Sequence, residues 1–383
     1  MTSPCGNIQT NKKILYIGGF ELPDKNAAAH RVLSLSKIMR DLGYDVTLIG
    51  VNKELKWGNN IFTTKSNVQG FETYAVPYPK SSKQWIKYLS DIQDYIGVIE
   101  ADKGFMAVCM YNFPAVGMKA FQKYCRPRGM KSIADVTEWY SAAGRGLAYL
   151  ILKGTDTCLR MRLYHKQLDG LILISKYLCN YYRKHKNTVY LPPLIDSEEE
   201  KWIGLQGKDP SSALRLVYAG SPIIKDRIDV LITATRKINR AYYLDIVGLT
   251  KEQYLERVPT DKAYLDSVDN IIFRGRLPHR EALNYVSQAD YSCFFRDNDR
   301  MTMAGFSTKF VEAISAGTPV LTNETSNLRD YSLEGKNALL LESIEPDAIA
   351  DTINKVPKSM QVDRKTFDYR GYRDVLKTLF DNL

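Results

Sequence analysis

Two hydrophobic patterns follow each other at the start of the chain. Residues 14–17 form a short apolar run that ends at Gly18 and Gly19, which is typical of a buried strand followed by a turn. From 28 to 42, apolar residues recur every three or four positions, which predicts a helix with one buried face that ends at Gly43. A second apolar run follows at 45–50. A strand, a helix and a strand in this order predict a βαβ unit, and therefore a parallel sheet covered by helices.

The same alternation continues and then restarts after a proline-containing segment. We predict further strands at 71–76, 105–110, 131–136 and 168–175, with a helical stretch around 85–95. Pro192 and Pro193 then exclude a helix and stiffen an extended link. Beyond the link, strands are predicted at 214–219, 242–247, 271–276 and 291–295, with helices at 228–238 and 278–289. A chain of 383 residues can bury two cores, so we expect two doubly wound α/β domains, 1–195 and 196–361.

The run 305–320 carries the most specific pattern. A loop of small residues opens a short helix, Gly317 ends it, and a strand begins at Pro319. The start of a helix presents unpaired N–H groups at the positive end of its dipole, which suits a phosphate. Lys309 adds positive charge, and Glu312, one turn later, is placed to accept hydrogen bonds from hydroxyls such as those of a ribose. A solvated Lys–Glu surface pair is the plain alternative.

This run resembles the nucleotide-sugar signature of family 4 glycosyltransferases. The closest pattern is that of the capsule and exopolysaccharide branch, in which Pro/Ser-Thr-Lys-Phe-x-Glu is followed by small residues and Gly-x-Pro-Val. The resemblance implies the GT-B fold, which has two facing Rossmann-like, doubly wound parallel-sheet domains with a cleft between them. It implies an N-terminal acceptor domain, a C-terminal nucleotide-sugar domain, and a tail, 362–383, that packs back on the first domain.

The resemblance also assigns residues in the second domain. A basic residue at the place of Lys225 holds the distal phosphate of the donor in this family. Together, Lys225 and Lys309 would neutralise the leaving diphosphate as catalytic groups. The predicted donor-binding residues here are Gly220, Ser221, Lys225, Gly305, Phe306, Ser307, Thr308, Lys309 and Glu312. The full family signature has a Glu where this chain has Ala304, which leaves the transferred sugar open.

In the first domain, the resemblance places a glycine turn and a helix start against the donor. Gly18 and Gly19 with His30 and Arg31 match the first loop of the family, so His30 and Arg31 are predicted to reach phosphate. A capping or surface role for His30 is the alternative. The third glycine of a dinucleotide fingerprint is missing, which argues against an NAD site.

Two acidic residues follow the strand predicted at 131–136. The carboxyl end of a parallel strand borders the crevice where such folds bind ligands, so Asp135 and Glu138 are candidate catalytic groups of the acceptor site. Capping of the next helix is an equally good interpretation. The run Asp-Val-Thr-Glu-Trp-Tyr resembles the same position in the bacterial polysaccharide branch of the family.

Composition narrows the classes of partner. The net charge is +10 and the pI about 9.1, which invites an anionic partner. The segment 145–166 alternates basic and apolar residues, which suits a helix on an anionic membrane or, equally, a helix packed on the sheet. The six cysteines form no Cys-x-x-Cys pair, and Asp297 and Asp299 lie in a polar loop, so we expect no metal and no cofactor.

The resemblance implies a glycosyltransferase of cell-surface polysaccharide synthesis that retains anomeric configuration. Its partners would be a nucleotide diphosphate sugar and a saccharide or polyprenyl-diphosphate-linked acceptor, with no nucleic acid. No apolar run is long enough to span a membrane and no apolar leader is present, so we expect a cytoplasmic location, with a peripheral position at the inner membrane face as a variant of it. The alternatives are a non-catalytic nucleotide-sugar-binding paralogue and a basic protein that binds nucleic acid or another anionic polymer. A GT-B epimerase or phosphorylase is the weakest alternative.

Overall fold

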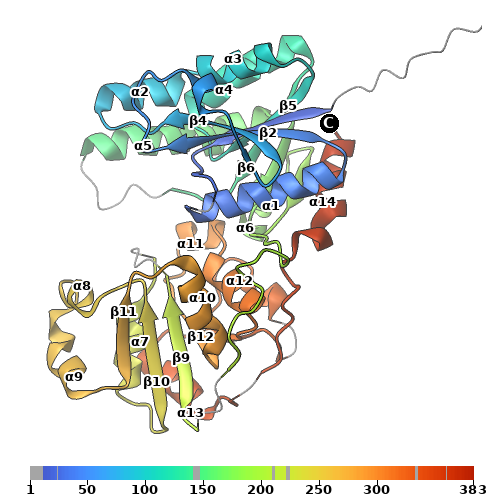
Figure 1. Ribbon diagram of the computed structural model, residues 1–383. Helices are drawn as coiled ribbons and strands as arrows, with labels where there is room; N and C mark the ends of the chain where they lie inside the picture. Colours follow the sequence, from blue (N-terminus) through green and yellow to red (C-terminus); the bar gives the residue numbers. More distant parts are fainter. Residues whose placement is uncertain are drawn as a thin grey trace, which may run out of the picture. The chain divides into compact units, whose positions relative to one another are not determined.

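The computed structural model describes residues 12–23, 25–140, 147–208, 212–220, 225–332, 335–358 and 360–383, with the side chains of 147–151 left undescribed. The chain forms two compact units. The first unit takes the chain up to Leu194 together with Tyr369–Leu383, and the second unit is Ile195–Asp368. Figure 1 shows both, coloured along the sequence. Each unit is described by itself below.

The first unit is built on one sheet, which has eight strands among the described residues, in the order β3-β4-β2-β1-β5-β6-β7-β8. All neighbours are parallel except β3 and β4, which are antiparallel. The strands are β1 (Lys13–Gly18), β2 (Asp45–Asn52), β3 (Ser66–Val68), β4 (Phe71–Pro77), β5 (Phe105–Tyr111), β6 (Lys131–Val136), β7 (Gly170–Leu173) and β8 (Thr188–Tyr190). The central strands are buried on both faces, as expected for a parallel sheet between helices.

Helices cover both faces of this sheet (Figure 1). They are α1 (Ala27–Asp41), α2 (Ser82–Ser90), α3 (Gln93–Ala101), α4 (Ala115–Cys125), α5 (Leu147–Leu159), α6 (Lys176–Tyr181) and α14 (Arg373–Asp381). On one face α1 packs beside α14, and on the other α4 contacts both α2 and α5. A π-helical turn, Arg160–Tyr164, continues α5.

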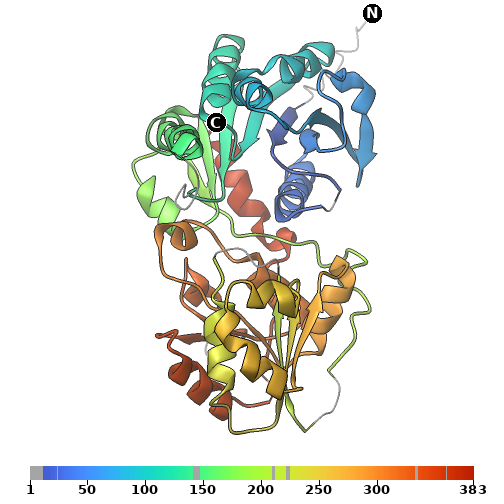
Figure 2. The same ribbon diagram turned by 90° about the vertical axis from the view of Figure 1, so that its left-hand side faces the viewer.

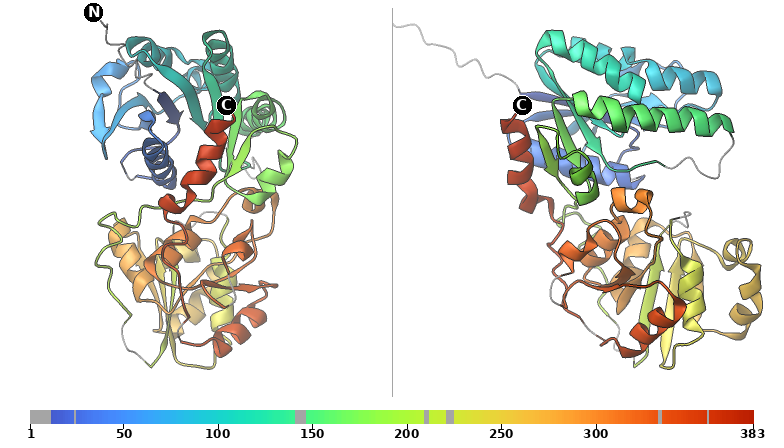
Figure 3. Two further views of the ribbon diagram at one scale, coloured as in Figure 1. Left: turned by 90° about the vertical axis from the view of Figure 1, so that its right-hand side faces the viewer. Right: turned by 180° about the vertical axis from the view of Figure 1, so that it is seen from behind.

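The C-terminal tail completes the core of the first unit. Leu376, Leu379 and Phe380 of α14 are buried in the same hydrophobic cluster as the apolar residues of β1 and α1. Figure 3 shows α14, in red, alongside the strands of this unit, where it contacts β8. Burying such side chains stabilises a fold by roughly 1.5–3 kcal/mol each. The last turns of the chain are therefore part of the first unit, although the whole second unit separates them in sequence.

The second unit repeats the same plan. Its sheet has six strands in the part of the chain that is described, all parallel, in the order β11-β10-β9-β12-β13-β14. The strands are β9 (Leu214–Ala219), β10 (Tyr242–Val247), β11 (Ile271–Gly275), β12 (Tyr291–Cys293), β13 (Val320–Asn323) and β14 (Ala338–Leu341). The helices are α7 (Ile228–Thr235), α8 (Lys251–Leu255), α9 (Lys262–Ser267), α10 (His279–Gln288), α11 (Arg300–Ala304), α12 (Thr308–Ala316) and α13 (Pro346–Lys355). The pairs α7–α13 and α10–α12 pack together, and α8 and α9 lie near the β11 edge of the sheet (Figure 2).

The structure departs from the predicted elements at three places. The helical stretch around 85–95 is two helices, α2 and α3, because the chain leaves helical geometry at Asp91, where the φ and ψ angles are −89° and 128°. Strand β3 is antiparallel, so the first sheet is not wholly parallel. Strand β8 lies at the start of the segment that the prolines mark as a link. Short 3-10 turns complete the chain at Ile61–Thr64, Arg126–Arg128, His165–Gln167, Pro259–Asp261, Leu328–Tyr331 and Tyr369–Tyr372.

No helix among the described residues has the length and apolar character needed to cross a membrane.

Candidate functional site

The second unit holds a buried aspartate that is bound from three sides. Asp226 lies between β9 and α7, and its side chain is 2% exposed. Lys309 Nζ is 2.8 Å from Asp226 Oδ2, and Arg296 Nε is 2.7 Å from Oδ1. The hydroxyl of Tyr218 donates a hydrogen bond to the same carboxylate at 2.8 Å. These four residues, called the Asp226 cluster, place two cations on one carboxylate, so the cluster carries an excess positive charge.

Lys309 reaches Asp226 by passing over Gly220. A Cβ atom placed on Gly220 would lie 2.0 Å from Lys309 Cε and 2.6 Å from Lys309 Nζ, which is far inside van der Waals contact. The amino group also lies 5.6 Å from the centre of the Tyr218 ring. Only glycine at position 220 lets the lysine lie against the end of β9 in this way. The structure thus brings together two of the predicted donor-binding residues, Gly220 and Lys309.

Burial and charge oppose each other in the Asp226 cluster. Burial would raise the pKa of Asp226, but Lys309 and Arg296 attract its charged form and hold the pKa below its usual value. Burial lowers the pKa of Lys309, and attraction by Asp226 offsets this only in part, because Arg296 repels the lysine. An additional anion beside Lys309 would favour the charged form of the lysine. The electrostatics therefore suit a negatively charged ligand.

The start of α12 supplies backbone donors next to this charge. Ser307 is the N-cap, and its hydroxyl accepts a hydrogen bond from the N–H of Phe310 at 3.4 Å. Within the described part of the chain, no hydrogen bond uses the N–H groups of Phe306, Ser307 or Thr308. Unpaired N–H groups at the positive end of a helix dipole are a suitable site for phosphate.

The residues before α12 anchor this loop. The N–H of Gly305 donates to the carbonyl of Met301 at 3.3 Å and ends α11. The Phe306 side chain is 8% exposed and packs edge-on against Tyr331 and Phe367, with ring centres 5.6 and 6.1 Å apart. Phe306 therefore holds the loop by its aromatic side chain, and only its backbone is available to a ligand.

Glu312 lies one turn after Lys309 and has a neighbour on α10. Its Oε1 is 3.4 Å from His279 Nε2, and the Glu312 side chain is 31% exposed. The carboxylate predicted to bind ribose hydroxyls is thus half-buried and accompanied by an imidazole that the sequence did not single out.

Three further positions of the predicted donor site have different outcomes. Lys225 directly precedes Asp226 in the chain and is partly buried. Ser221 lies outside the described residues. Ala304, where the family pattern has a Glu, is completely buried at the end of α11. A longer acidic side chain at Ala304 would have to displace packed neighbours.

The acidic loop at 297–299 has structural partners. Asp297 forms an ion pair with Arg227 at 2.9 Å, and Asp299 accepts a hydrogen bond from the N–H of Thr302 at 2.8 Å as the N-cap of α11. Across the described residues, no group of three or more His, Cys, Asp or Glu side chains is arranged to hold a metal ion.

In the first unit, two predicted site residues bind each other. Arg31 and Asp135 are 3% and 0% exposed. Arg31 Nη2 donates to Asp135 Oδ1 at 2.7 Å, Nε donates to Oδ2 at 2.9 Å, and Nη1 donates to the carbonyls of Leu191 and Pro192 at 3.0 Å. The Tyr16 hydroxyl donates to Asp135 Oδ2 at 2.6 Å. We call Asp135, Arg31 and Tyr16 the Asp135 cluster.

This geometry corrects the expected roles of Arg31 and Asp135. Both were predicted to reach a ligand, the first a phosphate and the second the acceptor. In the structure they are buried and bound to each other and to further partners inside the first unit, because the N-terminal part of α1, β6 and the segment 191–192 converge there. Their geometry supports a positioning role in place of direct contact.

The other predicted residues of the first unit lie nearer the surface. His30 is partly exposed on α1, and Glu138 is partly exposed after β6, where its Oε1 accepts a hydrogen bond from Asn112 Nδ2 at 3.3 Å. Gly18 ends β1 against Tyr111, whose carbonyl oxygen would lie 2.6 Å from a Cβ atom on that glycine. Gly19 follows it. The structure thus places Gly18 and Gly19 at the carboxyl end of β1, and Glu138 after β6 in the same sheet.

The basic segment 145–166 is partly internal. Arg160 is 1% exposed, and its guanidinium and the Lys153 amino group lie 5.1 and 4.6 Å from the centre of the Tyr140 ring. Arg160 Nη1 donates to the carbonyl of Asn112 at 2.8 Å, while Nε and Nη2 have no hydrogen-bond partner among the described residues. Arg145 and the side chains of 147–151 lie outside the description. For Arg160, the structure supports packing inside the unit over contact with a membrane.

Comparison with known proteins relates the second half of the chain to glycosyltransferases. Residues 206–374 match the family described as Glycosyl transferases group 1. Over this stretch the chain is similar to group 1 glycosyltransferases. A relative described as an uncharacterized glycosyltransferase of Methanocaldococcus jannaschii is 22% identical over 207 residues, which is 53% of this chain and 53% of the relative. The alignment therefore spans about half the length of that relative.

Solved structures extend this likeness to the whole chain. The sucrose-phosphate synthase of Thermosynechococcus elongatus is 15% identical with a TM-score of 0.66, covering 97% of this chain and 94% of its own. The catalytic domain of starch synthase IV from Arabidopsis thaliana, bound to ADP and acarbose, is 10% identical with a TM-score of 0.68, covering 97% and 99%. HepE from Anabaena, in complex with UDP and glucose, is 13% identical with a TM-score of 0.63, covering 97% and 100%. The chain therefore has the GT-B fold.

The Asp226 cluster lies within the stretch that matches the glycosyltransferase family. Only some residues of this cluster were predicted from the sequence. Lys309 and Gly220 were predicted, whereas Asp226, Tyr218 and Arg296 were not. Tyr218 is part of an apolar strand, and Arg296 follows β12 as one of many scattered arginines. A position next to Lys225 was the one hint that Asp226 had a larger role.

Proposed function

We propose that the protein is a glycosyltransferase that moves a sugar from a nucleoside diphosphate sugar to a saccharide or lipid-linked acceptor, with retention, in the synthesis of a cell-surface polysaccharide. The observation that carries the proposal is Lys309, which lies over Gly220 beside the unused N–H groups at the start of α12. The solved relatives hold UDP with glucose, or ADP with acarbose. Ligands of that kind have a diphosphate that would fit these donors.

The residues of the second unit divide the chemistry between them. Lys309 and Lys225, with the N–H groups of 306–308, would stabilise the diphosphate as it leaves. Glu312 would accept hydrogen bonds from hydroxyls of the ribose. In the transfer, the bond from the anomeric carbon to the diphosphate oxygen breaks, and a bond from that carbon to the acceptor oxygen forms on the same face. The acceptor proton passes to an oxygen of the departing phosphate.

The Asp226 cluster has a supporting part in this proposal. Asp226 holds the Lys309 amino group in place and partly neutralises it, and the pair with Arg296 fixes the carboxylate itself. The group that contacts phosphate is Lys309, while Asp226, Arg296 and Tyr218 position it.

Titration calorimetry with UDP, GDP and ADP tests the donor site. The wild-type chain should bind at least one of them, and Lys309→Ala should weaken that binding by about 10- to 100-fold, since a hydrogen bond to a charged group contributes roughly 1.5–3 kcal/mol. Lys237→Ala, which removes a lysine whose side chain is 58% exposed in the same unit, is the matched control. Equal affinities for all three proteins would contradict the assignment of the site.

Ala304 favours a second candidate function. The family signature has a Glu at this position, and the buried alanine leaves no acidic group there. A chain that bound nucleotide sugars without transferring the sugar would fit this departure. Tight donor binding, with neither hydrolysis nor transfer to any supplied saccharide, would support that function over the transferase.

A further inference from the structure

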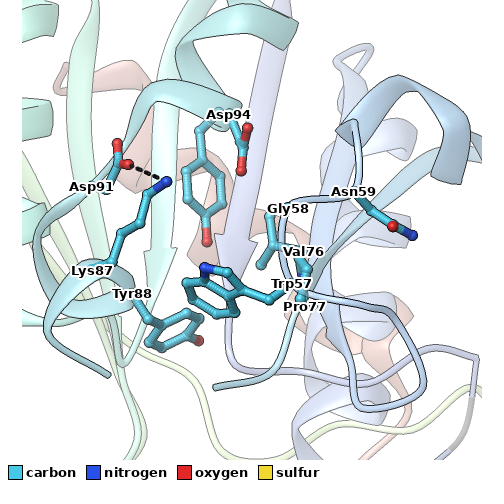
Figure 4. Close-up of a pocket in the computed structure, with 10 residues that line it drawn as sticks. Trp57, Gly58, Asn59, Val76, Pro77, Lys87, Tyr88, Asp91 and Asp94 are labelled. Atoms are coloured by element: carbon cyan, nitrogen blue, oxygen red, sulfur yellow. Dashed lines mark ion pairs between the residues drawn. The ribbon is translucent and has the colours of Figure 1, made fainter. Parts of the chain in front are cut away.

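A pocket of about 190 Å³ opens in the first unit, and none of the residues assigned above lines it. Its walls come from the segment after β2, the end of β4, and the two helices α2 and α3 (Figure 4). It is lined by Trp57, Gly58, Asn59, Val76, Pro77, Lys87, Tyr88, Asp91, Asp94 and Tyr95. Since one water occupies about 30 Å³ of liquid, the pocket has room for about six waters, which is the scale of one sugar ring.

We call this cavity the Trp57 pocket, and other aromatic rings pack against its aromatic walls. Tyr95 is 4% exposed, and its ring packs edge-on against Phe113 and Phe121, with centres 5.6 and 5.8 Å away. Tyr88 packs against Trp85 in the same way at 5.8 Å. Aromatic surfaces fixed by such contacts need little ordering when a ligand arrives.

The polar ends of these walls are available to a ligand. Among the described residues, no hydrogen bond or ion pair engages the hydroxyls of Tyr88 and Tyr95, the indole N–H of Trp57 or the carboxylate of Asp94. Tyr95 is thus a polar side chain, more than nine-tenths buried, that lines the pocket with its hydroxyl unpartnered. Donors and acceptors around an apolar, aromatic floor match the hydroxyls and C–H faces of a pyranose.

The charge of the pocket is opposite to that of the chain. Asp91 and Asp94 face one cation, Lys87, which is 3.5 Å from Asp91 Oδ2 (Figure 4). Burial, and then repulsion by Asp91, raise the pKa of Asp94. The chain as a whole carries +10. A ring with its own carboxylate or phosphate would be repelled here, whereas a neutral or amino sugar would not.

The Trp57 pocket also adjoins the turn after β1. The Tyr88 hydroxyl lies 3.9 Å from the position that a Cβ atom on Gly19 would take. The ends of β1 and β4 are carboxyl ends of the same sheet, and open α/β sheets bind ligands outside that edge.

We propose that the Trp57 pocket binds one pyranose ring of the acceptor, and that this ring is a neutral or amino sugar. The role of this sugar as the acceptor rests on the proposed function, whereas its binding in the pocket does not. Trp57 and Tyr88 provide the surfaces against which the ring lies, and Asp94 accepts a hydrogen bond from a ring hydroxyl or ammonium group.

Saturation-transfer NMR on the full chain tests this site. The probes are the methyl glycosides of glucose, galactose, mannose, glucosamine and glucuronic acid. We expect at least one neutral or amino glycoside to bind, and the glucuronide to bind more weakly. Trp57→Ala, which removes a surface against which the ring lies, and Asp94→Asn, which removes a charged hydrogen-bond acceptor, should each weaken binding about tenfold or more. Phe62→Ala, another partly exposed aromatic, and Glu100→Gln, on the same helix as Asp94, are the matched controls and should bind like the wild type.

Three results would overturn the proposal: no glycoside binds at tens of millimolar, the glucuronide binds best, or both pocket variants bind like the wild type. The nucleotide titration described above separates the two proposals. Nucleotide binding without glycoside binding removes the pocket assignment alone. Glycoside binding that depends on Trp57, with no nucleotide bound by the wild type, removes the proposed function and leaves the sugar site.

Discussion

The Asp135 cluster and the Asp226 cluster each bury an aspartate beside a tyrosine and a cation, but they differ in the cation and in its exposure. Each places a buried aspartate near the end of a central strand, with a tyrosine hydroxyl and a cation on it. In the first unit the cation is Arg31, whose side chain is 4% exposed. In the second unit it is Lys309, whose side chain is 15% exposed, with a second cation on the same carboxylate.

The difference separates an architectural pair from a ligand-ready one. Arg31 directs four of its five N–H donors to Asp135 and to two carbonyls of the chain, and it is 3% exposed, so it is not available to a ligand. Within the described chain, Lys309 has one ion pair, with Asp226, and a lowered pKa, and it belongs to the first turn of α12, where N–H groups are unused. A cation beside an aspartate is therefore not by itself a binding site. The two clusters differ in how far the donors of the cation are already used by partners inside the protein.

Among the changes that test this comparison, removal of the Asp135 charge should have the largest effect, and the effect is on the free energy of unfolding. Asp135→Asn leaves the Arg31 guanidinium buried without a counterion, and breaking a buried pair in this way costs about 3–5 kcal/mol of unfolding free energy. Asp45→Asn is the matched control, because the Asp45 side chain is 63% exposed and 3.5 Å from Lys13. Urea unfolding of both variants gives the measurement. A change below about 1 kcal/mol in Asp135→Asn would mean that Arg31 has another partner.

Closing the space at Gly220 should have an intermediate effect, and mainly on binding. Gly220→Ala puts a methyl group where Lys309 passes, so the lysine must move away from Asp226. We expect nucleoside diphosphate affinity to fall about tenfold or more, as for loss of one charged hydrogen bond. Calorimetry measures it, with Gly207→Ala as a control, because a Cβ atom there meets nothing within 4 Å. Unchanged affinity in Gly220→Ala would remove Lys309 from the phosphate site.

The smallest expected effect is on the pH dependence of nucleotide binding. Because burial lowers the pKa of Lys309, its charge is lost at a pH below the usual lysine value of about 10.4. Affinity should therefore fall as pH rises through that lowered pKa, by up to about tenfold per pH unit above it. Tyr218 does not compete in this range, since burial and Asp226 hold its pKa well above the usual value.

ADP titrations between pH 7 and 10.5 would measure this dependence if ADP is bound, and Lys309→Ala provides the control. The variant should lose the alkaline decline along with most of its affinity. A wild-type affinity that stays flat up to pH 10.5 would show that the lysine charge does not contribute to binding.

The sequence was most informative where one element carries its own signal. The short helix within 305–320 was predicted from the loop of small residues that opens it and the glycine that ends it, and the structure has Thr308–Ala316 helical, with Ser307 as the N-cap and Gly317 in the left-handed conformation at φ 88°. The βαβ plan of both units followed from periodicity in the same way. The break between α2 and α3 was missed, because apolar spacing continues through Asp91 and only the backbone angles there end the helix.

The candidate site divides along the same line. Lys309 and Glu312 were found because they occupy one short helix with a recognisable pattern. Arg296 and Tyr218 were not, since each lies on a separate segment and their only signal is spatial. The hydrogen-bond partners of Arg31 could not be predicted from the sequence either, because they are Asp135 and the carbonyls of 191–192, which are more than a hundred residues away.

The sequence by itself determined the local elements, the two α/β halves and the phosphate-ready start of α12, because caps, glycines and apolar periods act over a few residues. Only the tertiary structure decided which charged side chains are paired inside the fold and which are available to a ligand. Whether a cation can serve a ligand depends on its burial and on every donor and acceptor around it, and those come from strands and helices that the sequence does not place side by side. That is why Arg31 and Lys309, similar in the sequence, have different roles in the folded protein.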